Sequence, residues 1–270
     1  MQLVRPTVND WNLFNRWAKA EGWSVPAYEL DLYRGELADD ALVLKDGDAC
    51  CGFVTAVAYE KSGWIGNLVV PEHLRGKGYG RELFEQSIKG LEQRGIDSIW
   101  LTASEMGQPL YQQYGFEAIG TIERFVLMPK TAPEKTATAQ PSEKLLAASA
   151  AFWDESRAAL LSPLSGQSCV FASGDSCALL QQHTEFQIIG PWYSPARSSD
   201  ELSEVLQGCL AHLKPGIKTV IDMVQDQMVG DLLQTTGFTA TGTNRLMVKG
   251  CHDHIDHGSL VSLASLGSMG

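Results

Sequence analysis

The residues whose types and spacing could do chemistry gather in the run VVPEHLRGKGYGR, from Val69 to Arg81. Gly76, Gly78 and Gly80 alternate in this run, and because glycine has no Cβ, the backbone there can adopt positive φ values and approach a ligand closely. A helix expected from Arg81 adds the free N–H groups of its first turn and the positive end of its dipole. The run therefore predicts a turn that holds a phosphate or diphosphate group.

The charge of this turn supports the same prediction. Arg75, Lys77 and Arg81 make it a basic segment in a chain whose net charge is −11. Two better-known phosphate loops do not fit the spacing. A Walker A loop needs Ser or Thr after Gly-Lys, whereas Gly78 follows Lys77 here, and the third glycine comes too soon for the dinucleotide pattern G-x-G-x-x-G. The run therefore belongs to neither class.

A second landmark lies in the segment PLYQQYGFEAIG, residues 109–120. It predicts a helix that carries Tyr111 and ends at Gly115, followed by a strand through Phe116. A tyrosine on such a helix is more often half-buried with its hydroxyl in water. Its pairing with the glycine turn makes a chemical role the preferred interpretation.

The elements that must position these residues can be read from the apolar pattern. Residues 3–5 predict a strand, Asn9-Asp10 the cap of a helix, and residues 41–60 two strands around a tight turn. Residues 65–70 are apolar and β-branched, which indicates a buried strand that ends at a proline, and residues 96–101 indicate another. The order is strand, helix, antiparallel strands, and then a strand–helix–strand crossover.

The length of 270 residues allows two domains, each with its own core. From Pro129 the composition changes to a run rich in Pro, Ala, Thr and Lys without apolar periodicity, which indicates a linker. We expect a first domain at residues 1–130, a linker at 131–142 and a second domain at 143–270.

The second half of the chain repeats the first faintly but in order. GFEAIGT at 115–121 recurs as GFTATGT at 237–243, and DGDAC at 46–50 recurs as SGDSC at 173–177. The copies differ at the chemical positions, because the second has no glycines spaced for a phosphate and carries Leu233 in place of the tyrosine. We expect the second copy not to bind a nucleotide in the same way.

These features resemble a known family. The spacing Arg75-x-x-Gly78-x-Gly80 resembles the acetyl-coenzyme A signature of the GNAT N-acetyltransferases, and Y-x-x-x-G-F from Tyr111 resembles the segment after their fifth strand. Runs across the whole chain, such as AKAEGW, FWDESRAALL and SLASLGSMG, are similar to the YitH-like tandem acetyltransferases. The resemblance implies an α/β fold in which helices flank a mixed, twisted sheet, in two tandem copies of which the second is degenerate.

The resemblance also implies a reaction, the transfer of acetyl from acetyl-coenzyme A to a primary amine by direct attack. Tyr111 would be the general acid toward the coenzyme sulfur. Glu105 is the expected general base, with water relayed to bulk as the alternative, since Asn67 cannot accept a proton at neutral pH. The other implied site residues are Leu68, Val69, Val70, Arg75, Gly76, Lys77, Gly78, Tyr79, Gly80, Arg81 and Ser104 for the coenzyme, and Glu21, Trp23, Asp31 and Asn67 for the acceptor.

Two alternatives from other classes stay open. The protein could be a non-catalytic acyl-coenzyme A sensor whose second domain contacts a partner. It could also bind a small molecule through Trp192 and Tyr193 in the second half, although packing is the preferred interpretation of both side chains. Tyr111 favours catalysis over sensing, because a sensor has no need of an acid for a thiolate.

Composition limits the setting and the partners. The chain has no apolar run of membrane-spanning length and no signal peptide, and its six cysteines lack metal or disulfide spacing, which predicts a cytoplasmic protein away from membranes. The acidic balance argues against nucleic-acid binding. CHDHIDH at 251–257 lacks the ligand spacing of a zinc site, so no metal is expected. The expected partners are a small-molecule or peptide amine and, as an open option, a second copy of the chain.

Overall fold

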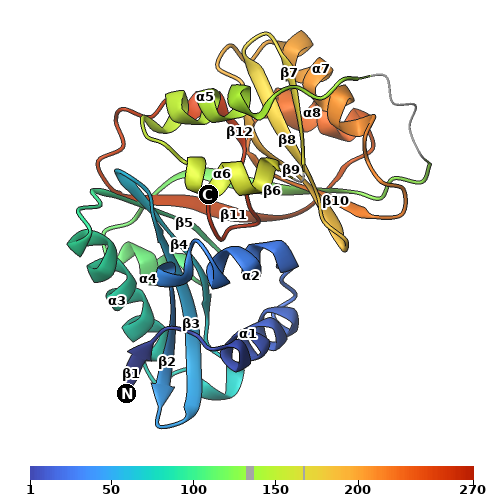
Figure 1. Cartoon of the computed structure of the whole chain (residues 1–270). Coiled ribbons are helices and arrows are strands. Elements are labelled where there is room, and N and C mark those ends of the chain that lie inside the picture. The colour runs from blue at the N-terminus through green and yellow to red at the C-terminus, as the bar shows by residue number, and fades with distance from the viewer. Residues whose placement is uncertain (132–136, 167) are drawn as a thin grey trace. The chain divides into compact units, whose positions relative to one another are not determined.

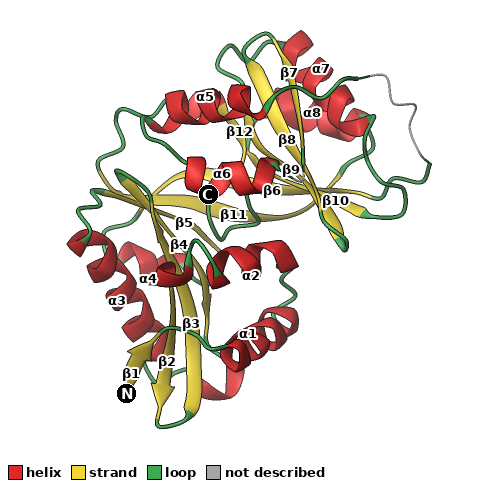
Figure 2. Cartoon of the chain, viewed as in Figure 1, coloured by secondary structure: helices red, strands yellow, loops and turns green. Residues whose placement is uncertain are grey.

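The structure is a computed structural model that describes residues 1–131, 137–166 and 168–270. The chain divides into two compact units (Figure 1). The first contains residues 1–101 together with residues 266–270, and the second contains residues 102–265. Both units combine a mixed sheet with flanking helices, which confirms the expected α/β fold (Figure 2).

The first unit contains a sheet with the strand order β1-β2-β3-β4-β5, in which only the β4–β5 pair is parallel. In Figure 1, α1 and α2 lie on one side of these strands and α3 on the other. The elements are β1 (Gln2–Val4), α1 (Val8–Ala20), α2 (Ala27–Arg34), η1 (Ala38–Asp40), β2 (Ala41–Asp46), β3 (Ala49–Ala58), β4 (Ser62–Val69), η2 (Glu72–Leu74), α3 (Tyr79–Gln93) and β5 (Ser98–Ala103). The last two residues of β5 belong to the second unit.

Helix α1 begins earlier than the sequence pattern suggested. Its N-cap is Thr7, not Asn9 or Asp10, because Thr7 and Asp10 form a capping box. The Thr7 hydroxyl accepts from the Asp10 N–H at 3.3 Å, and the Asp10 carboxylate accepts from the Thr7 N–H at 2.8 Å. Asp10 also forms an ion pair with Lys45 at 2.9 Å. The expected capping residue is therefore the third residue of the helix.

The core of the first unit on the α1–α2 side is aromatic. The rings of Trp11 and Phe14 on α1, Tyr33 on α2 and Phe53 on β3 pack with centroids 5.2 to 5.9 Å apart, and all four side chains are buried. Such rings bury large areas and prefer tilted or edge-on contacts at these distances. Their packing fixes α2 against the sheet.

Strand β4 carries a bulge where the chemistry is expected. Phe53 of β3 faces Val69, and Thr55 faces Gly66, so a three-residue step on β4 opposes a two-residue step on β3. Asn67 lies inside this bulge with φ 51°, a left-handed conformation that asparagine tolerates better than most residues. The bulge turns the Asn67 side chain away from the regular alternation of the strand.

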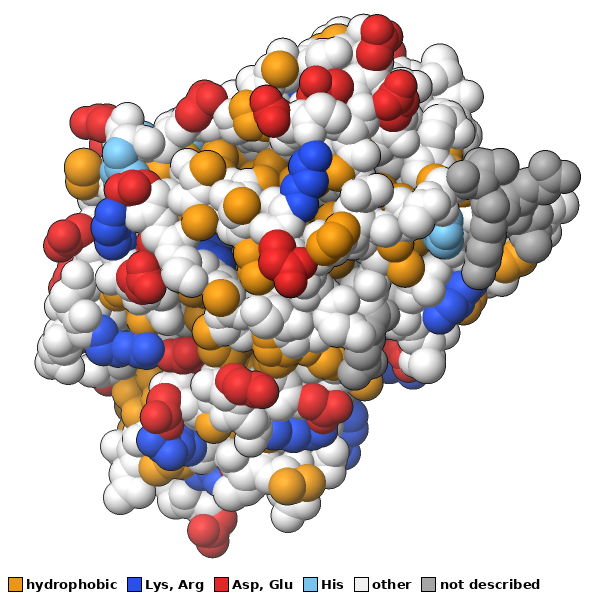
Figure 3. All heavy atoms as spheres, turned by 45° about the horizontal axis from the view of Figure 1, so that its top comes forward, with side chains coloured by type: hydrophobic (Ala, Val, Ile, Leu, Met, Phe, Trp, Pro, Cys, Tyr) orange, Lys and Arg blue, Asp and Glu red, His pale blue; other side chains and the backbone are white. Residues whose placement is uncertain are grey.

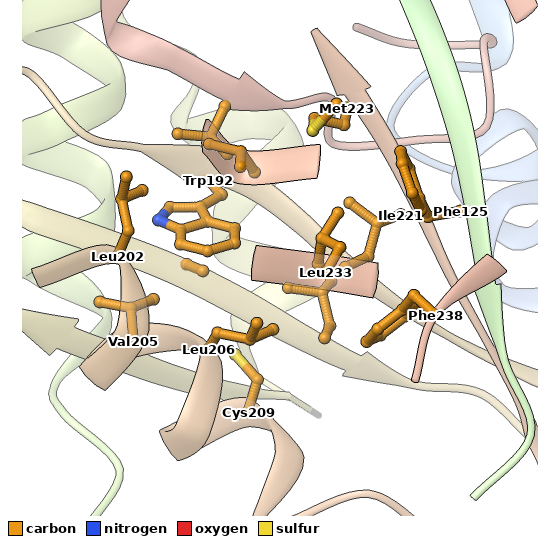
Figure 4. Packing of buried hydrophobic residues seen from close by; sticks show 14 of the residues in the cluster. Phe125, Trp192, Leu202, Val205, Leu206, Cys209, Ile221, Met223, Leu233 and Phe238 are labelled. Atoms are coloured by element: carbon orange, nitrogen blue, oxygen red, sulfur yellow. The ribbon is translucent and has the colours of Figure 1, made fainter. Parts of the chain in front are cut away.

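The second unit contains a sheet with the order β11-β6-β10-β12-β9-β8-β7. Its core includes Trp192, Phe125, Ile221 and Leu233, which point toward one another in Figure 4. The elements are α4 (Gln108–Gln112), β6 (Glu117–Leu127), α5 (Ser142–Trp153), α6 (Ala158–Ser165), β7 (Cys169–Ser173), β8 (Ser176–Gln182), β9 (Phe186–Tyr193), α7 (Ser199–Leu210), β10 (Lys218–Val224), α8 (Gln227–Thr235), β11 (Thr239–Gly250), η3 (His257–Ser259) and β12 (Leu260–Ser262).

The order of elements from α5 to β11 is the same as the order from α1 to β6: two helices, three antiparallel strands, a helix, a strand, a helix and a strand. The correspondence extends to detail. β9 also has a bulge, between the residues opposite Ala178 and Leu180, and β9 pairs in parallel with β10 as β4 does with β5. The same order of elements therefore occurs twice along the described chain.

The two compact units do not coincide with the expected domains. β6 was expected in the first domain, but it pairs with β10 and β11 of the second unit, and residues 266–270 return to the first unit. The expected linker, residues 131–142, lies partly outside the described residues, which omit 132–136. In its described part, the Gln140 N–H donates to the Val170 carbonyl at 2.7 Å, and α5 begins at Ser142.

Candidate functional site

Two of the three glycines in the turn have the positive φ that the sequence predicts, and Gly80 instead lies in the helix. Gly76 and Gly78 have φ of 77° and 85°, and a Cβ added to either would meet no atom within 4 Å. Gly78 is the N-cap of α3, and the Glu82 N–H closes the first helical turn onto the Gly78 carbonyl at 3.0 Å. The helix begins at Tyr79, so Gly80 lies in its first turn. The N–H groups of that turn have no intrahelical acceptor and are available to an anion.

The basic side chains of the turn are exposed, but one of them is already bound. Arg75 donates from Nε to the Val70 carbonyl at 2.9 Å, and its guanidinium pairs with Glu21. Lys77 and Arg81 are exposed as well. The structure therefore places Glu21 beside the glycine turn, although the sequence pattern assigned it to the acceptor site.

The strand end that leads into the turn carries the residues expected to contact the coenzyme chain. β4 ends at Val69, which is buried, while Leu68 and Val70 are half-buried. The parallel pairing of β4 with β5 covers only residues 62–64 and 98–100 in the described chain. In the described chain the second half of β4 is therefore not paired with β5, as an added ligand strand on that edge would require.

The bulge of β4 meets a buried carboxylate that the sequence pattern did not single out. Glu29 on α2 is 4 % exposed, and its Oε1 accepts from Asn67 Nδ2 at 3.3 Å. Burial raises the pKa of Glu29 to about 7, while hydrogen bonding from Ser268 and Asn67 opposes that rise. Glutamate is rarely buried. The burial of Glu29 is visible only in three dimensions, because in the sequence Glu29 is one of several acidic residues near α2.

Residues 266–270 lie against the same part of the first unit. Three consecutive carbonyls accept hydrogen bonds from side chains: that of Gly267 from Trp64 Nε1 at 3.1 Å, that of Ser268 from the Tyr33 hydroxyl at 3.2 Å, and that of Met269 from the Tyr59 hydroxyl at 2.6 Å. A Cβ on Gly66 would lie 2.6 Å from the Ser268 backbone. The absence of a side chain at Gly66 therefore lets this segment reach β4.

The other residues expected at the acceptor site lie outside this buried cluster. Asp31 is exposed on α2 and pairs with Arg34 at 3.2 Å, and the Trp23 side chain is 39 % exposed. Of the four acceptor residues that the sequence suggested, Asn67 is the one whose hydrogen bond joins the buried carboxylate.

Ser104, Glu105 and Tyr111 belong to the second unit. The Ser104 hydroxyl accepts from the Gly107 N–H at 3.2 Å, just before α4, and Glu105 is exposed. Tyr111 on α4 is half-buried, with its ring 6.3 Å from that of Phe116, and burial raises its pKa to about 12. The Tyr111 hydroxyl therefore keeps its proton throughout the neutral range.

In the second unit, strand β12 occupies the position that corresponds to the part of β4 not paired with β5. β9 and β10 pair in parallel over residues 186–188 and 218–220, and β12 then lies between them, with Leu260 opposite Tyr193 and Ser262 opposite Met223. A Cβ on Gly190 would lie 2.0 Å from the Leu263 carbonyl oxygen, so the inserted segment is in tight contact with β9.

The aromatic pair of the second half is packed, as expected. Trp192 is fully buried in the core and donates to the Ser176 hydroxyl at 3.0 Å. Tyr193 is 3 % exposed and, with Phe152 and Pro195, borders a cavity of about 500 Å³. Trp192 is therefore a core residue, while Tyr193 also faces this cavity.

Other features of the described residues carry no separate site. No helix among them is both long and apolar enough to cross a membrane. Across residues 1–131, 137–166 and 168–270, no group of three or more His, Cys, Asp or Glu side chains is arranged to hold a metal ion. On the face shown in Figure 3, acidic and basic side chains are interspersed rather than gathered by sign.

Comparison with known proteins matches residues 10–116 to the acetyltransferase (GNAT) family. The curated proteins compared gave no match. Among solved structures, a provisionally assigned acetyltransferase from Pyrococcus horikoshii is similar over 100 % of this chain and 95 % of its own, with a TM-score of 0.80 and 17 % identity. A GCN5-related N-acetyltransferase from Sphaerobacter thermophilus is similar over 96 % and 98 %, with a TM-score of 0.66 and 14 % identity. At these identities the two structures show that the fold is shared over nearly the whole chain.

Proposed function

From the GNAT acetyltransferase domain that residues 10–116 carry, we propose that the protein transfers acetyl from acetyl-coenzyme A to a primary amine. The observation that carries the proposal is the glycine turn. Gly76 and Gly78 are left-handed and uncrowded, and they lead directly into the N-terminus of a 15-residue helix. The turn offers backbone donors, the positive end of a helix dipole and nearby cations to the two phosphates of the coenzyme.

The remaining coenzyme contacts follow from the strand end. Val69 and Val70 pair with the amides of the pantetheine chain, and a backbone N–H in the segment Leu68 to Val70 stabilises the oxyanion of the tetrahedral intermediate. Lys77 and Arg81 add charge to the phosphate contacts. Arg75 contributes if it exchanges its pairing with Glu21 for the phosphates, or it orients the turn through the Val70 carbonyl.

Tyr111 is proposed as the general acid that assists the departing sulfur. A free thiol has a pKa of about 8.5, well below the value of about 12 for Tyr111. The hydroxyl therefore always carries the proton it offers, and its contribution is a hydrogen bond that strengthens as negative charge builds on sulfur. Exchange with solvent completes the protonation of the thiolate.

The second half is proposed to be a degenerate copy that has lost the coenzyme site. This proposal is supported by the repeated order of elements and by β12, which lies between β9 and β10. The acceptor is a small-molecule or peptide amine, and its entry side is proposed to be the α2–β4 region of the first unit.

The test combines binding with turnover. Calorimetry should detect acetyl-coenzyme A binding to the wild-type chain, and Gly78→Val should weaken it at least about 10-fold, because a β-branched residue is strained in the left-handed region. Gly95→Val is the matched control. Gly95 has φ 80° at the far end of α3, so this variant carries comparable strain and should bind normally.

A screen of primary amines should then show acetyl-coenzyme A-dependent release of thiol. Binding without release from any amine would replace the enzyme with the acyl-coenzyme A sensor considered above. No binding at millimolar coenzyme, or equal weakening by Gly78→Val and Gly95→Val, would contradict the proposed coenzyme site itself.

A further inference from the structure

The buried carboxylate of Glu29 is not explained by the stability of the fold. Burial of a carboxylate is costly unless the charge is paired, and the neighbours that contact Glu29 here are neutral groups, Asn67 and Ser268. A glutamine or an apolar residue would fill the same space at lower cost. Glu29 is also held in place, because Tyr33 of the same helix α2 packs against Trp11 of α1, and both side chains are buried. A costly and rigidly held carboxylate is typical of a functional position.

The groups around Glu29 come from three segments. Tyr33 lies one turn later on α2, Asn67 lies in the bulge of β4, and Ser268 lies in the segment 266–270. Tyr33 is a titratable side chain close to Glu29, and burial together with the charge of Glu29 raises the pKa of Tyr33, so it stays neutral. Asn67 and Ser268 can orient the carboxylate without neutralising it.

We propose that Glu29 is the general base of the transfer, and that Asn67 and Ser268 are positioning residues that hold its carboxylate toward the acceptor. The inference rests on the proposed acetyl transfer. It replaces the expected base, Glu105, which is exposed and lies in the second unit. Asn67 lies in the bulge of β4, next to the strand end that is proposed to present the thioester. The proposed base on α2 therefore lies beside the same short stretch of β4 that carries the expected oxyanion donor.

The protons balance as follows. The ionised Glu29 carboxylate takes one proton from the acceptor ammonium, and the neutral amine attacks the thioester carbon. The C–N bond forms, the C–S bond breaks, and the nitrogen loses a second proton as the thiolate gains one. The products are an N-acetyl amine and coenzyme A thiol, and Glu29 returns its proton to solvent.

This predicts the pH dependence of the reaction and its sign. A base must be deprotonated to act, so kcat/KM should rise with pH through about 7, the pKa of Glu29, and level off above it. Glu29→Gln keeps the volume and the hydrogen bond of Asn67 but cannot take a proton. It should lower kcat about 10²-fold or more and remove the inflection near 7. Glu36→Gln, an exposed residue just after α2, is the matched control and should leave both unchanged.

Asn67→Asp separates a base from a merely structural carboxylate. Aspartate tolerates the left-handed bulge as asparagine does. It places a second carboxylate beside Glu29, so the inflection should move to higher pH because like charges oppose ionisation. Carbon-13 NMR measures the pKa of the Glu29 carboxyl independently of activity, and this pKa should also be higher in the variant.

Calorimetry with acetyl-coenzyme A keeps the two proposals distinguishable. Glu29→Gln should bind the coenzyme within about twofold of wild type. Normal turnover by a folded Glu29→Gln variant, or an inflection near 7 that survives in it, would overturn the role of Glu29 and leave the acetyltransferase proposal intact. An inflection that does not move in Asn67→Asp while the NMR titration does would also overturn it.

Discussion

At the scale of single residues, the proposed site separates groups that would bind from groups that would move protons. The glycine turn is proposed to bind through its backbone, so what matters at Gly76 and Gly78 is the lack of a side chain. The roles proposed for Glu29 and Tyr111 depend on their side chains, and burial shifts the pKa of each upward, to about 7 and about 12. Burial thus brings the pKa of the Glu29 carboxyl close to neutral pH, where its ionised form can accept a proton. It also keeps the Tyr111 phenol protonated.

Tyr111→Phe tests the proposed acid. Loss of the hydroxyl removes a donor to the departing sulfur, so thiol release should fall about 10²-fold while acetyl-coenzyme A binding stays within a factor of two or three. Steady-state assays of thiol release measure the first and calorimetry the second. Tyr114→Phe, three residues later on the same segment, is the control and should retain its rate. Equal effects of the two changes would count against a chemical role for Tyr111.

At the scale of elements, the bulge of β4 and the segment 266–270 depend on each other. The segment reaches β4 only because Gly66 has no side chain, and Trp64, Tyr33 and Tyr59 then donate to its carbonyls. The first unit is therefore completed by residues from the far end of the sequence. A truncation after the expected first domain would remove this segment, and it would keep β6 but remove its partner strands β10 and β11.

Gly66→Ala should displace that segment without distorting the strand. A methyl group 2.6 Å from the Ser268 backbone forces a shift, so hydrogen exchange of residues 266–269 should rise and stability should fall by roughly 1–3 kcal/mol. Gly90→Ala is the control, since Gly90 lies inside α3 with no atom within 4 Å of the added Cβ. It should stabilise the protein by about 0.5–1 kcal/mol. Unchanged exchange in Gly66→Ala would contradict the close packing.

At the scale of the whole molecule, the segments α1–β6 and α5–β11 have the same order of elements but differ at one strand edge. In the first, the second half of β4 is free of β5 in the described pairing, whereas in the second, β12 lies between β9 and β10. Residues 194–198, which correspond to the glycine turn of the first half, are Ser-Pro-Ala-Arg-Ser and contain no glycine. The repeated order of elements therefore comes with a different strand edge and a different turn in the two halves.

The chain should accordingly bind one acetyl-coenzyme A. Isothermal titration of the full-length protein should give a stoichiometry of one, and Gly78→Val should remove the whole signal rather than half of it. A stoichiometry of two would show that the second unit binds the coenzyme despite β12.

The sequence alone determined what depends on short runs. The glycine turn, the helix after it and the helix with Tyr111 are set by local backbone preferences and apolar spacing, and the repeat is visible because both copies keep the same turns. The start of α1 was misplaced, because Thr7 and Asp10 cap the helix reciprocally and either can look like the cap. The α/β fold followed from the order of these local elements.

Tertiary structure decided what depends on contacts between distant residues. Glu29 became notable only once α2 was packed against the bulge of β4, since burial, which sets its pKa, is a property of the folded surroundings and not of its neighbours in sequence. The same holds for Asp31, two residues away but exposed, for β6 in the second unit and for residues 266–270 in the first. A one-dimensional pattern shows which residues can be buried together, but it cannot show which strand or tail a given side chain will meet.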